Sequence, residues 1–167
     1  MEPSYKRALA LVVGRGLSGM GTALTSFALN LWLFEQLRSY SIFALLTVLN
    51  TLPMLLFSPV AGVFADRLPR KGIIVSCDLA AASCIVGVST LSHYDALKPS
   101  HVVWACILLS LLRTFSWPAS VASMSALASA NMRPRVNGTA ETIEGGITIC
   151  GPVLGAFLYK TIGLTGV

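Results

Sequence analysis

Long apolar runs alternate along this chain with short polar connections. Five runs, covering residues 8–34, 42–65, 73–91, 102–127 and 144–164, are each long enough for a helix of about 20 residues to cross the hydrocarbon core of a bilayer. Their apolar positions are continuous and do not alternate with polar ones, which argues against a membrane β-barrel. The pattern therefore predicts an all-α membrane protein with five transmembrane helices.

Composition supports the membrane class. Of the 167 residues, 54% are hydrophobic and only 11% are charged, whereas soluble domains carry about 25% charged residues. The basic N-terminal tail leads into an apolar run without a clear small-residue cleavage site, so we expect residues 8–34 to be a retained first span and not a signal peptide. The expected surroundings are a lipid bilayer.

Lysine and arginine gather in three connections. The N-terminal tail and the connections between spans two and three and between spans four and five hold seven bases, namely Lys6, Arg7, Arg67, Arg70, Lys71, Arg133 and Arg135. The other two connections hold only Arg38 and Lys98. This bias predicts a cytoplasmic N-terminus. Although the net charge is +5, the bases do not interleave with aromatic residues, so no nucleic-acid partner is expected.

Arg113 lies near the middle of the fourth span. A central Arg costs about 2.5–3.5 kcal/mol on insertion scales, so we expect it to face the protein interior or a wet cavity. Two interpretations stay open: a functional side chain on a substrate or proton pathway, and a structural ion pair with a neighbouring helix. Pro118, five residues later, is expected to kink the same span.

Four further charged residues lie within the spans or at their ends. Arg15 is expected to snorkel to the interface in a topological or structural role, with a ligand role as the alternative. We expect Asp78 to pair with Arg70 or Lys71 and so to hold the connection before span three, with proton carriage as the alternative. Glu141 and Glu144 are attributed to the favourable interaction of acids with the N-terminal end of span five.

Small residues mark one side of span one, in "GRGLSGMGTALTS". Gly14, Ser18 and Ala23 share this side, and Gly16, Gly19 and Gly21 lie beside it. In lipid, small residues allow helix backbones to approach closely. The pattern predicts a packing seam, which is compatible with a helix that slides against its neighbour.

Candidate chemistry is sparse. The cysteines, Cys77, Cys84, Cys106 and Cys150, lie inside apolar runs without metal-ligand or disulfide spacing. No Ser/His/Asp or Cys/His arrangement has a catalytic spacing. We therefore expect no metal, no cofactor and no enzymatic activity.

The stretch "GVFADRLPRKGII", Gly62 to Ile74, resembles the signature of the loop between helices two and three of the major facilitator superfamily. Gly62, Asp66, Arg67, Arg70 and Lys71 match the signature, and Pro69 stands where Gly is commonest. "GTALTSFALNLWLFEQL", "LLFSPVAGVFADR", "FSWPAS" and "RVNGTAE" resemble the macrolide-efflux and siderophore-exporter-like branch.

A second stretch, "GPVLGA", resembles the antiporter motif of span five in that superfamily. Gly151, Pro152 and Gly155 match it. Ala156 replaces its last Gly, and Ile147 stands where an upstream Gly is expected. Arg113 falls where drug exporters of the superfamily often carry an Arg.

The resemblance implies a secondary active transporter of the bacterial inner membrane that exports a small amphipathic molecule, drug or siderophore-like, in exchange for protons. It implies a cytoplasmic gate motif that comprises Gly62, Asp66, Arg67, Arg70, Lys71 and Asp78. Asp66 and Arg70 would pair if a helix continued through them, and Asp78 would compete for the same bases.

The five spans correspond to part of an N-terminal six-helix bundle, whereas the family has two such bundles. We expect the chain to be a fragment or truncated product that lacks the second bundle. The expected partners are a small-molecule substrate and the missing C-terminal half or a complementary chain. The alternative is a membrane interaction subunit that transports nothing itself and assembles with another membrane chain.

Overall fold

The computed structural model describes residues 3–38 and 40–164, with side chains described for 8–38, 44 and 48–164. In these residues the chain forms five helices and no strand. They are α1 (Pro3–Leu37), α2 (Tyr40–Arg67), α3 (Arg70–His93), α4 (Pro99–Leu127) and α5 (Arg133–Ile162). All five are long and apolar enough to cross a membrane. The predicted fold class is thus confirmed, and the chain is a multi-pass membrane protein.

Helices α1, α2 and α3 extend beyond the apolar runs at both ends, α4 and α5 extend only at their N-terminal ends, and α5 differs most from expectation. Residues 133–141, which we expected in the loop between spans four and five, lie in the first three turns of α5. Pro134 lies in the first turn, where its missing N–H costs no hydrogen bond. Hydropathy marks only the part of a helix that lies in hydrocarbon, so it gave no signal for this polar extension.

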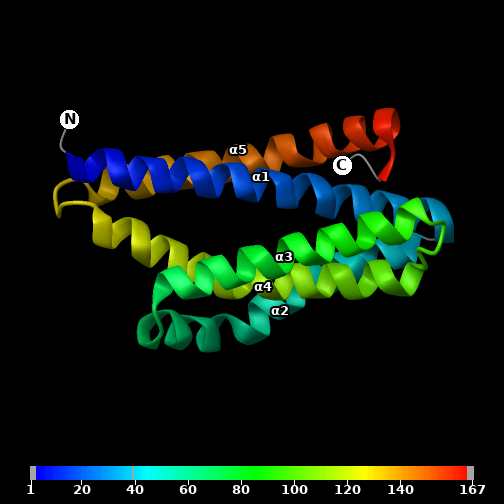
Figure 1. Cartoon of the computed structure of the whole chain (residues 1–167), viewed down its shortest axis with the longest axis horizontal. Helices are drawn as coiled ribbons and strands as arrows, with labels where there is room; N and C mark the ends of the chain where they lie inside the picture. The colour runs from blue at the N-terminus through cyan, green and yellow to red at the C-terminus, as the bar shows by residue number, and fades with distance from the viewer. Residues whose placement is uncertain (1–2, 39, 165–167) are drawn as a thin grey trace.

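The three base-rich segments lie at one end of the bundle. In Figure 1 the N-terminus, the α2–α3 connection and the α4–α5 connection are all on the left, and the other two connections are on the right. The helices therefore alternate in direction as the charge pattern predicts. Figure 1 also shows α1 and α5 running side by side, with α2, α3 and α4 forming the other side of the bundle.

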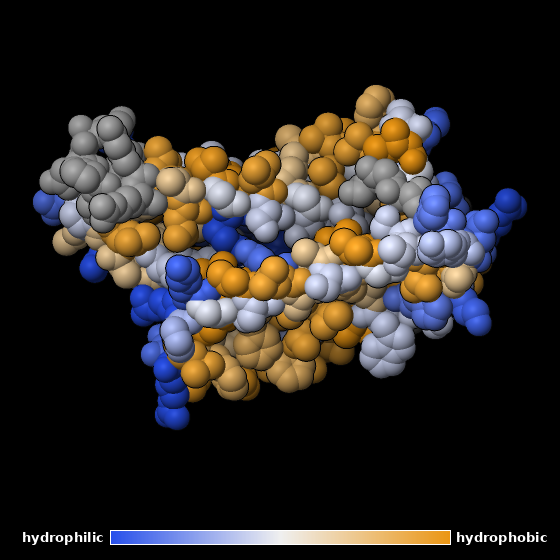
Figure 2. All heavy atoms as spheres, in the orientation of Figure 1, coloured by the Kyte–Doolittle hydropathy of each residue, from blue (hydrophilic) through white to orange (hydrophobic). Residues whose placement is uncertain are grey.

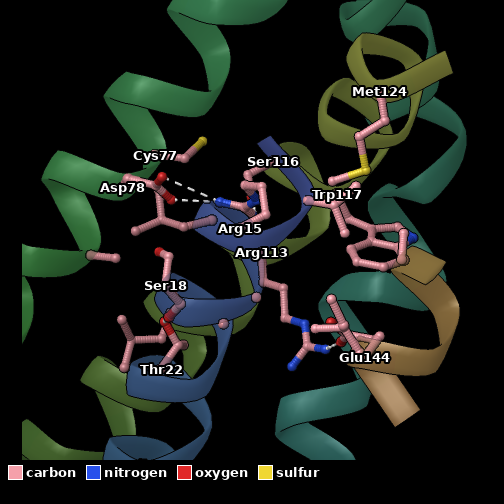
Figure 3. Close-up of a pocket in the computed structure, with 18 residues that line it drawn as sticks. Arg15, Ser18, Thr22, Cys77, Asp78, Arg113, Ser116, Trp117, Met124 and Glu144 are labelled. Carbon is pink, nitrogen blue, oxygen red and sulfur yellow. Dashed lines mark hydrogen bonds and ion pairs between the residues drawn. The ribbon is translucent and has the colours of Figure 1, made fainter. Parts of the chain in front are cut away.

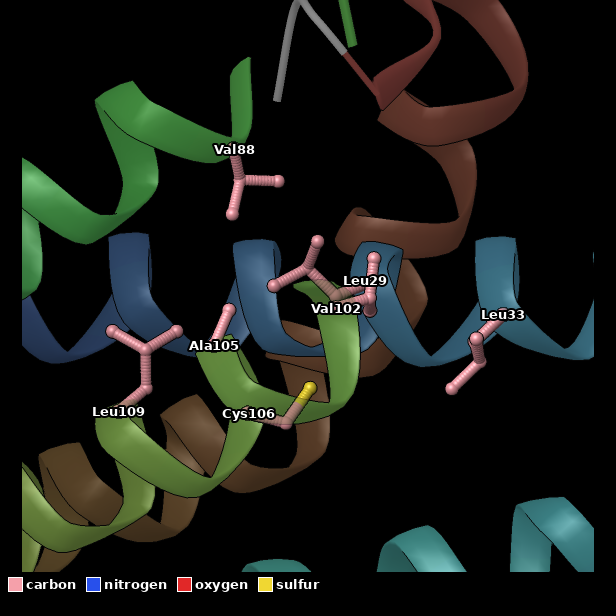
Figure 4. Packing of buried hydrophobic residues seen from close by; sticks show 7 residues of the cluster. All are labelled: Leu29, Leu33, Val88, Val102, Ala105, Cys106 and Leu109. Carbon is pink, nitrogen blue, oxygen red and sulfur yellow. The ribbon is translucent and has the colours of Figure 1, made fainter. Parts of the chain in front are cut away.

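Helix α4 occupies the centre of the packing, because it contacts all four other helices. One apolar cluster joins α1, α3 and α4 and includes Leu29, Val88, Val102 and Leu109 (Figure 4). Figure 1 shows that α4 bends in its C-terminal half, the part that contains Pro118. A proline inside a helix removes one backbone hydrogen bond, which accounts for a bend of this kind.

The most extensive helix pair is α1 with α5, and small residues permit its close contact. A Cβ atom added at Gly16 would lie 2.6 Å from Cγ2 of Ile143, and one at Gly151 would lie 2.9 Å from Cβ of Ala23. Gly14 and Gly21 have open space instead. A close-packed seam on α1 is therefore present, but it runs through Gly16, Gly19 and Ala23, so the predicted place of Gly14 in it is wrong. Gly16 makes the closest contact in α1.

Candidate functional site

A small polar cavity of about 60 Å³ lies between α1, α3, α4 and α5 (Figure 3). This volume holds a few water molecules and no drug-sized ligand. Its polar lining comprises Arg15, Ser18, Thr22, Asp78, Arg113, Ser116 and Glu144. The three charged side chains that the sequence placed inside spans, Arg15, Asp78 and Arg113, thus meet at one site.

Arg15 joins three helices. Its Nη1 donates to Oδ1 of Asp78 at 2.9 Å and to Oδ2 at 3.2 Å, and its Nη2 donates to Oγ of Ser116 at 2.9 Å. The Arg15 side chain is only 18% exposed. Arg15 therefore does not snorkel to the interface, because its guanidinium is bound between α1, α3 and α4. These contacts agree with the structural role that the sequence analysis also named, and not with the topological one.

The expected partner of Asp78 is also wrong. Asp78 pairs with Arg15, 63 residues away, and not with Arg70 or Lys71. Arg70 and Asp78 lie on the same helix about 12 Å apart along its axis, at 1.5 Å per residue, which is too far for a direct contact. The Asp78 side chain is 41% exposed. Figure 2 shows hydrophilic atoms in a hollow between α1 and α3, with apolar surface around it.

Arg113 forms a hydrogen-bonded ion pair with Oε1 of Glu144, which links α4 to α5 (Figure 3). Both interpretations from sequence find support, since Arg113 pairs with a neighbouring helix and also lines the cavity. The side chain of Arg113 is 52% exposed and that of Glu144 is 22% exposed. The carboxylate therefore lies deeper in the bundle than the guanidinium that it holds.

Glu144 is the site residue that the sequence reasoning missed. We attributed it to the N-terminal end of a helix, but it lies about three turns inside α5. A signal was available, because Glu144, Ile147, Gly151 and Gly155 share one face of a helix. That face packs on α1, as the short distances from α1 to the two glycines show.

A larger cavity of about 290 Å³ adjoins the first and lies between α1, α2, α4 and α5. Its polar lining comprises Thr22, Ser26, Asn30, Asn50, Ser110, Arg113 and Thr148. Arg113 is the one charged residue among the described residues of this lining, and it lines the smaller cavity as well. The guanidinium of Arg113 therefore lies between the two cavities, and the larger cavity presents hydroxyl and amide groups to it.

The signature residues of the α2–α3 connection lie at the end of the bundle. Asp66 and Arg67 end α2, and Arg70 and Lys71 begin α3 after a break at positions 68–69. The helix does not continue through the signature, and Asp66 is in neither of the ion pairs found among the described side chains. The condition for an Asp66–Arg70 helical pair is thus not met.

Arg70 has a different partner in α4. Its Nη1 donates to the backbone carbonyl oxygen of Ala122 at 3.1 Å, which ties the start of α3 to the C-terminal half of α4. Gly62 has open space around its Cα. In the span-five motif, Gly155 lies against Leu24 and Phe27 of α1, and Pro152 lines the larger cavity.

A bundle of membrane-spanning helices around a polar, charge-paired interior is typical of a membrane transport protein. Comparison with known families agrees, because the profile of the Major Facilitator Superfamily matches residues 11–167. The chain belongs to this superfamily of transporters, and the resemblance found in the sequence is confirmed. Members of this superfamily are typically transporters and not enzymes.

Two kinds of curated relative are similar to the chain. Macrolide efflux protein A of Streptococcus pyogenes is 25% identical over 154 residues, which cover 92% of this chain and 38% of the relative. An uncharacterized MFS-type transporter of Bacillus subtilis, YkuC, is 26% identical over 152 residues, covering 89% of this chain and 34% of the relative. The chain thus spans less than two-fifths of the length of these relatives. No solved structure matches it significantly.

Proposed function

We propose that the chain forms part of a secondary active exporter in the bacterial inner membrane, with its N-terminus in the cytoplasm. The substrate is a small amphipathic molecule, drug or siderophore-like, and its export is coupled to proton entry. The efflux proteins among the relatives support export. The collection of bases at one end of the bundle supports the orientation, since cytoplasmic connections carry the excess of Lys and Arg.

The position of Arg113 carries this proposal. A charged side chain in the middle of a span is costly unless it serves a polar interior. Arg113 meets a carboxylate on one side and a cavity lined by hydroxyls and amides on the other. Transporters of this superfamily bind substrate near the bilayer midplane between two bundles. We therefore assign Arg113 to the substrate and proton pathway, and the second bundle is the proposed partner of this chain.

We assign the cytoplasmic gate to the α2–α3 signature, with Gly62, Asp66, Arg67, Arg70 and Lys71. The bond from Arg70 to α4 supports this role, because it connects the signature to the helix that carries Arg113. Asp78 joins the gate through α3, which holds the signature bases at one end and the Arg15 pair about two turns later. Gly151, Pro152 and Gly155 provide the close contact of α5 with α1 beside the cavity.

The test is Arg113→Ala in the whole protein expressed from its own gene in a susceptible bacterial strain. We expect resistance to a macrolide, or export of a radiolabelled one, to fall to the level of the empty vector. Removing a central Arg lowers the insertion cost, but it also leaves Glu144 without its counter-ion. Export is therefore expressed relative to the amount of protein in the membrane, measured by immunoblot in the same cells. Arg135→Ala, an exposed base at the end of the bundle, is the control and should keep export. Unchanged export by Arg113→Ala would contradict the assignment.

A further inference from the structure

Glu144 is the ion-pair partner of Arg113, and this pairing holds the guanidinium away from other acceptors. Its carboxylate lies against the glycine-lined side of α1, with Oε2 4.0 Å from the position that a Cβ atom on Gly19 would take. A side chain at position 19 would restrict the space beside this carboxylate. The carboxylate is therefore held between α1 and α4 and not in bulk water.

Among the described residues, Arg113 is the one counter-ion available to Glu144. From α1, Arg15 lines the same cavity, but its guanidinium already donates to Asp78 and Ser116. From α3, the charged group in the lining is Asp78, which is neutralised by Arg15. From α2, no titratable residue with a described side chain lines either cavity. Both pairs are neutral when both acids are ionised, so protonation of Glu144 leaves one uncompensated positive charge, on Arg113.

Arg113 has a second environment within reach. Its side chain lines the larger cavity, where the polar groups are hydroxyls and amides and no acid is present among the described residues. Thr148, one turn after Glu144 on the same face of α5, lies in that cavity. A guanidinium carries five N–H donors. Released from Glu144, it would offer them to any oxygen acceptor in the larger cavity.

We propose that Glu144 is the proton-binding group of the exporter and that its protonation transfers Arg113 from the ion pair to the substrate. This inference rests on the proposed function. One proton adds to the Glu144 carboxylate and makes a neutral acid, so the ionic attraction to Arg113 is lost. The guanidinium keeps its charge and binds a carbonyl, hydroxyl or carboxylate oxygen of the substrate. Loss of the proton restores the ion pair and displaces the substrate oxygen.

The direct test records the protonation of Glu144 without a substrate. The whole protein is placed in vesicles of phosphatidylcholine and phosphatidylglycerol, and infrared difference spectra are taken between acidic and alkaline pH. We expect the wild-type spectrum to contain a carboxylic acid C=O component that Glu144→Gln lacks and that Glu141→Gln, which removes an exposed acid one turn earlier on α5, retains. Its wavenumber should differ from that of the component lost in Glu141→Gln, because Glu144 lies between helices. A Glu144→Gln spectrum that keeps every wild-type component would overturn the proposal.

Transport gives the second readout. In inverted vesicles with a radiolabelled macrolide, we expect a pH gradient to stimulate uptake by the wild type and by Glu141→Gln. Glu144→Gln should take up the macrolide at the same rate with and without the gradient, while it still exchanges labelled for unlabelled macrolide. Stimulation of Glu144→Gln by the gradient would overturn the role of Glu144. The double variant Glu144→Gln/Arg113→Gln leaves no lone charge, so its infrared band tests the proposal if the single variant fails to fold.

The outcomes separate the two proposals. If Arg113→Ala exports normally, the proposed pathway itself fails. Suppose instead that Arg113→Ala is inactive, while Glu144→Gln keeps the full carboxylic acid C=O band and its uptake is still stimulated by the pH gradient. The assignment of Arg113 to the substrate pathway then holds, and the assignment of the proton to Glu144 fails.

Discussion

The guanidinium of Arg15 donates to three oxygen atoms, whereas that of Arg113 donates to one among the described residues. Arg15 is also the less exposed of the two, at 18% against 52%. A charge with several acceptors in a fixed geometry is costly to displace, and a charge with one acceptor and open space beside it is not. We infer that Arg15 fixes the positions of three helices and that Arg113 is free to change partners.

This difference predicts that loss of Asp78 affects stability. Asp78→Asn removes the charge opposite Arg15 and leaves a guanidinium with weakened partners inside the bundle. We expect a loss of about 1–3 kcal/mol, the usual cost of an unpaired polar group, visible as a lower midpoint of thermal unfolding in detergent. Tryptophan fluorescence provides the measurement.

Asp95→Asn, an exposed acid in the α3–α4 connection, is the matched control. The double variant Arg15→Gln/Asp78→Asn should regain part of the lost stability, because no single charge remains. If Asp78→Asn and Asp95→Asn unfold at the same temperature, the structural role of the pair is contradicted.

Residue positions were easier to predict than residue partners. The sequence placed Arg113 and Asp78 inside spans because each interrupts a long apolar run. It assigned Asp78 to nearby bases, whereas the true partner is 63 residues away on another helix. An ion pair across helices depends on their rotation about their own axes, and hydropathy along one chain carries little information about that rotation.

At the scale of elements, α1 and α5 are held together by close packing of complementary surfaces. Gly16 receives Ile143, and Gly151 receives Ala23, so each helix supplies both a space and the side chain that fills the space of the other. Tyr159 adds a hydrogen bond to Oε2 of Glu35 at 2.6 Å near the end of both helices. In lipid, where apolar surfaces gain little by association, such close packing is the main attraction between helices.

A methyl group at the contact should therefore separate these helices. We expect Gly151→Ala to destabilise the protein by about 1–3 kcal/mol relative to Gly145→Ala, as overpacking does in other cores. Gly145 lies on the same helix with open space around it, so its replacement reports helix propensity alone. Thermal unfolding in detergent measures both variants.

Ala23 supplies a compensating change. In the variant Ala23→Gly/Gly151→Ala the methyl group moves from α1 to α5, and we expect most of the lost stability to return. A double variant that is less stable than Gly151→Ala alone would contradict this account of the contact.

The five helices were predictable because each contains an apolar run long enough to cross a membrane. The positions at which the helices begin and end were harder to predict. The first three turns of α5 are polar and contain Pro134, and both features also fit a loop. This error had a consequence for the site, since a helix that starts at Arg133 places Glu144 inside the bundle and not at its end.

At the scale of the molecule, the alternation of helix direction puts every base-rich segment at one end. We predict that this end faces the cytoplasm. In a background without the four native cysteines, Leu68→Cys and Ala96→Cys place a thiol in the α2–α3 and α3–α4 connections. A membrane-impermeant maleimide should label Ala96→Cys in intact cells and Leu68→Cys only after the membrane is opened. The reverse labelling would invert the proposed orientation.

The sequence did not predict which helices pack around α4. Charge bias gives the side of each connection, and it says nothing about which helices are neighbours. The glycine seam of α1 predicted that some helix packs closely there, but α5 was one of several candidates. The partner became clear only when Ile143, Ala23 and Gly151 were seen at contact distance.

The pairing of α1 with α5 also sets the order in which the bundle assembles. On the order of 100 residues separate these two helices, which is about 5–20 s of synthesis at 5–20 residues per second. During this interval α1 lies in the bilayer, and its glycine-lined face is not yet packed against α5. Arg15 is neutralised earlier, when α3 brings Asp78 into the membrane. During synthesis the chain therefore passes through a stage in which Arg15 is paired with Asp78 but the contact of α1 with α5 has not yet formed. A membrane chaperone would bind the chain in this partly assembled state.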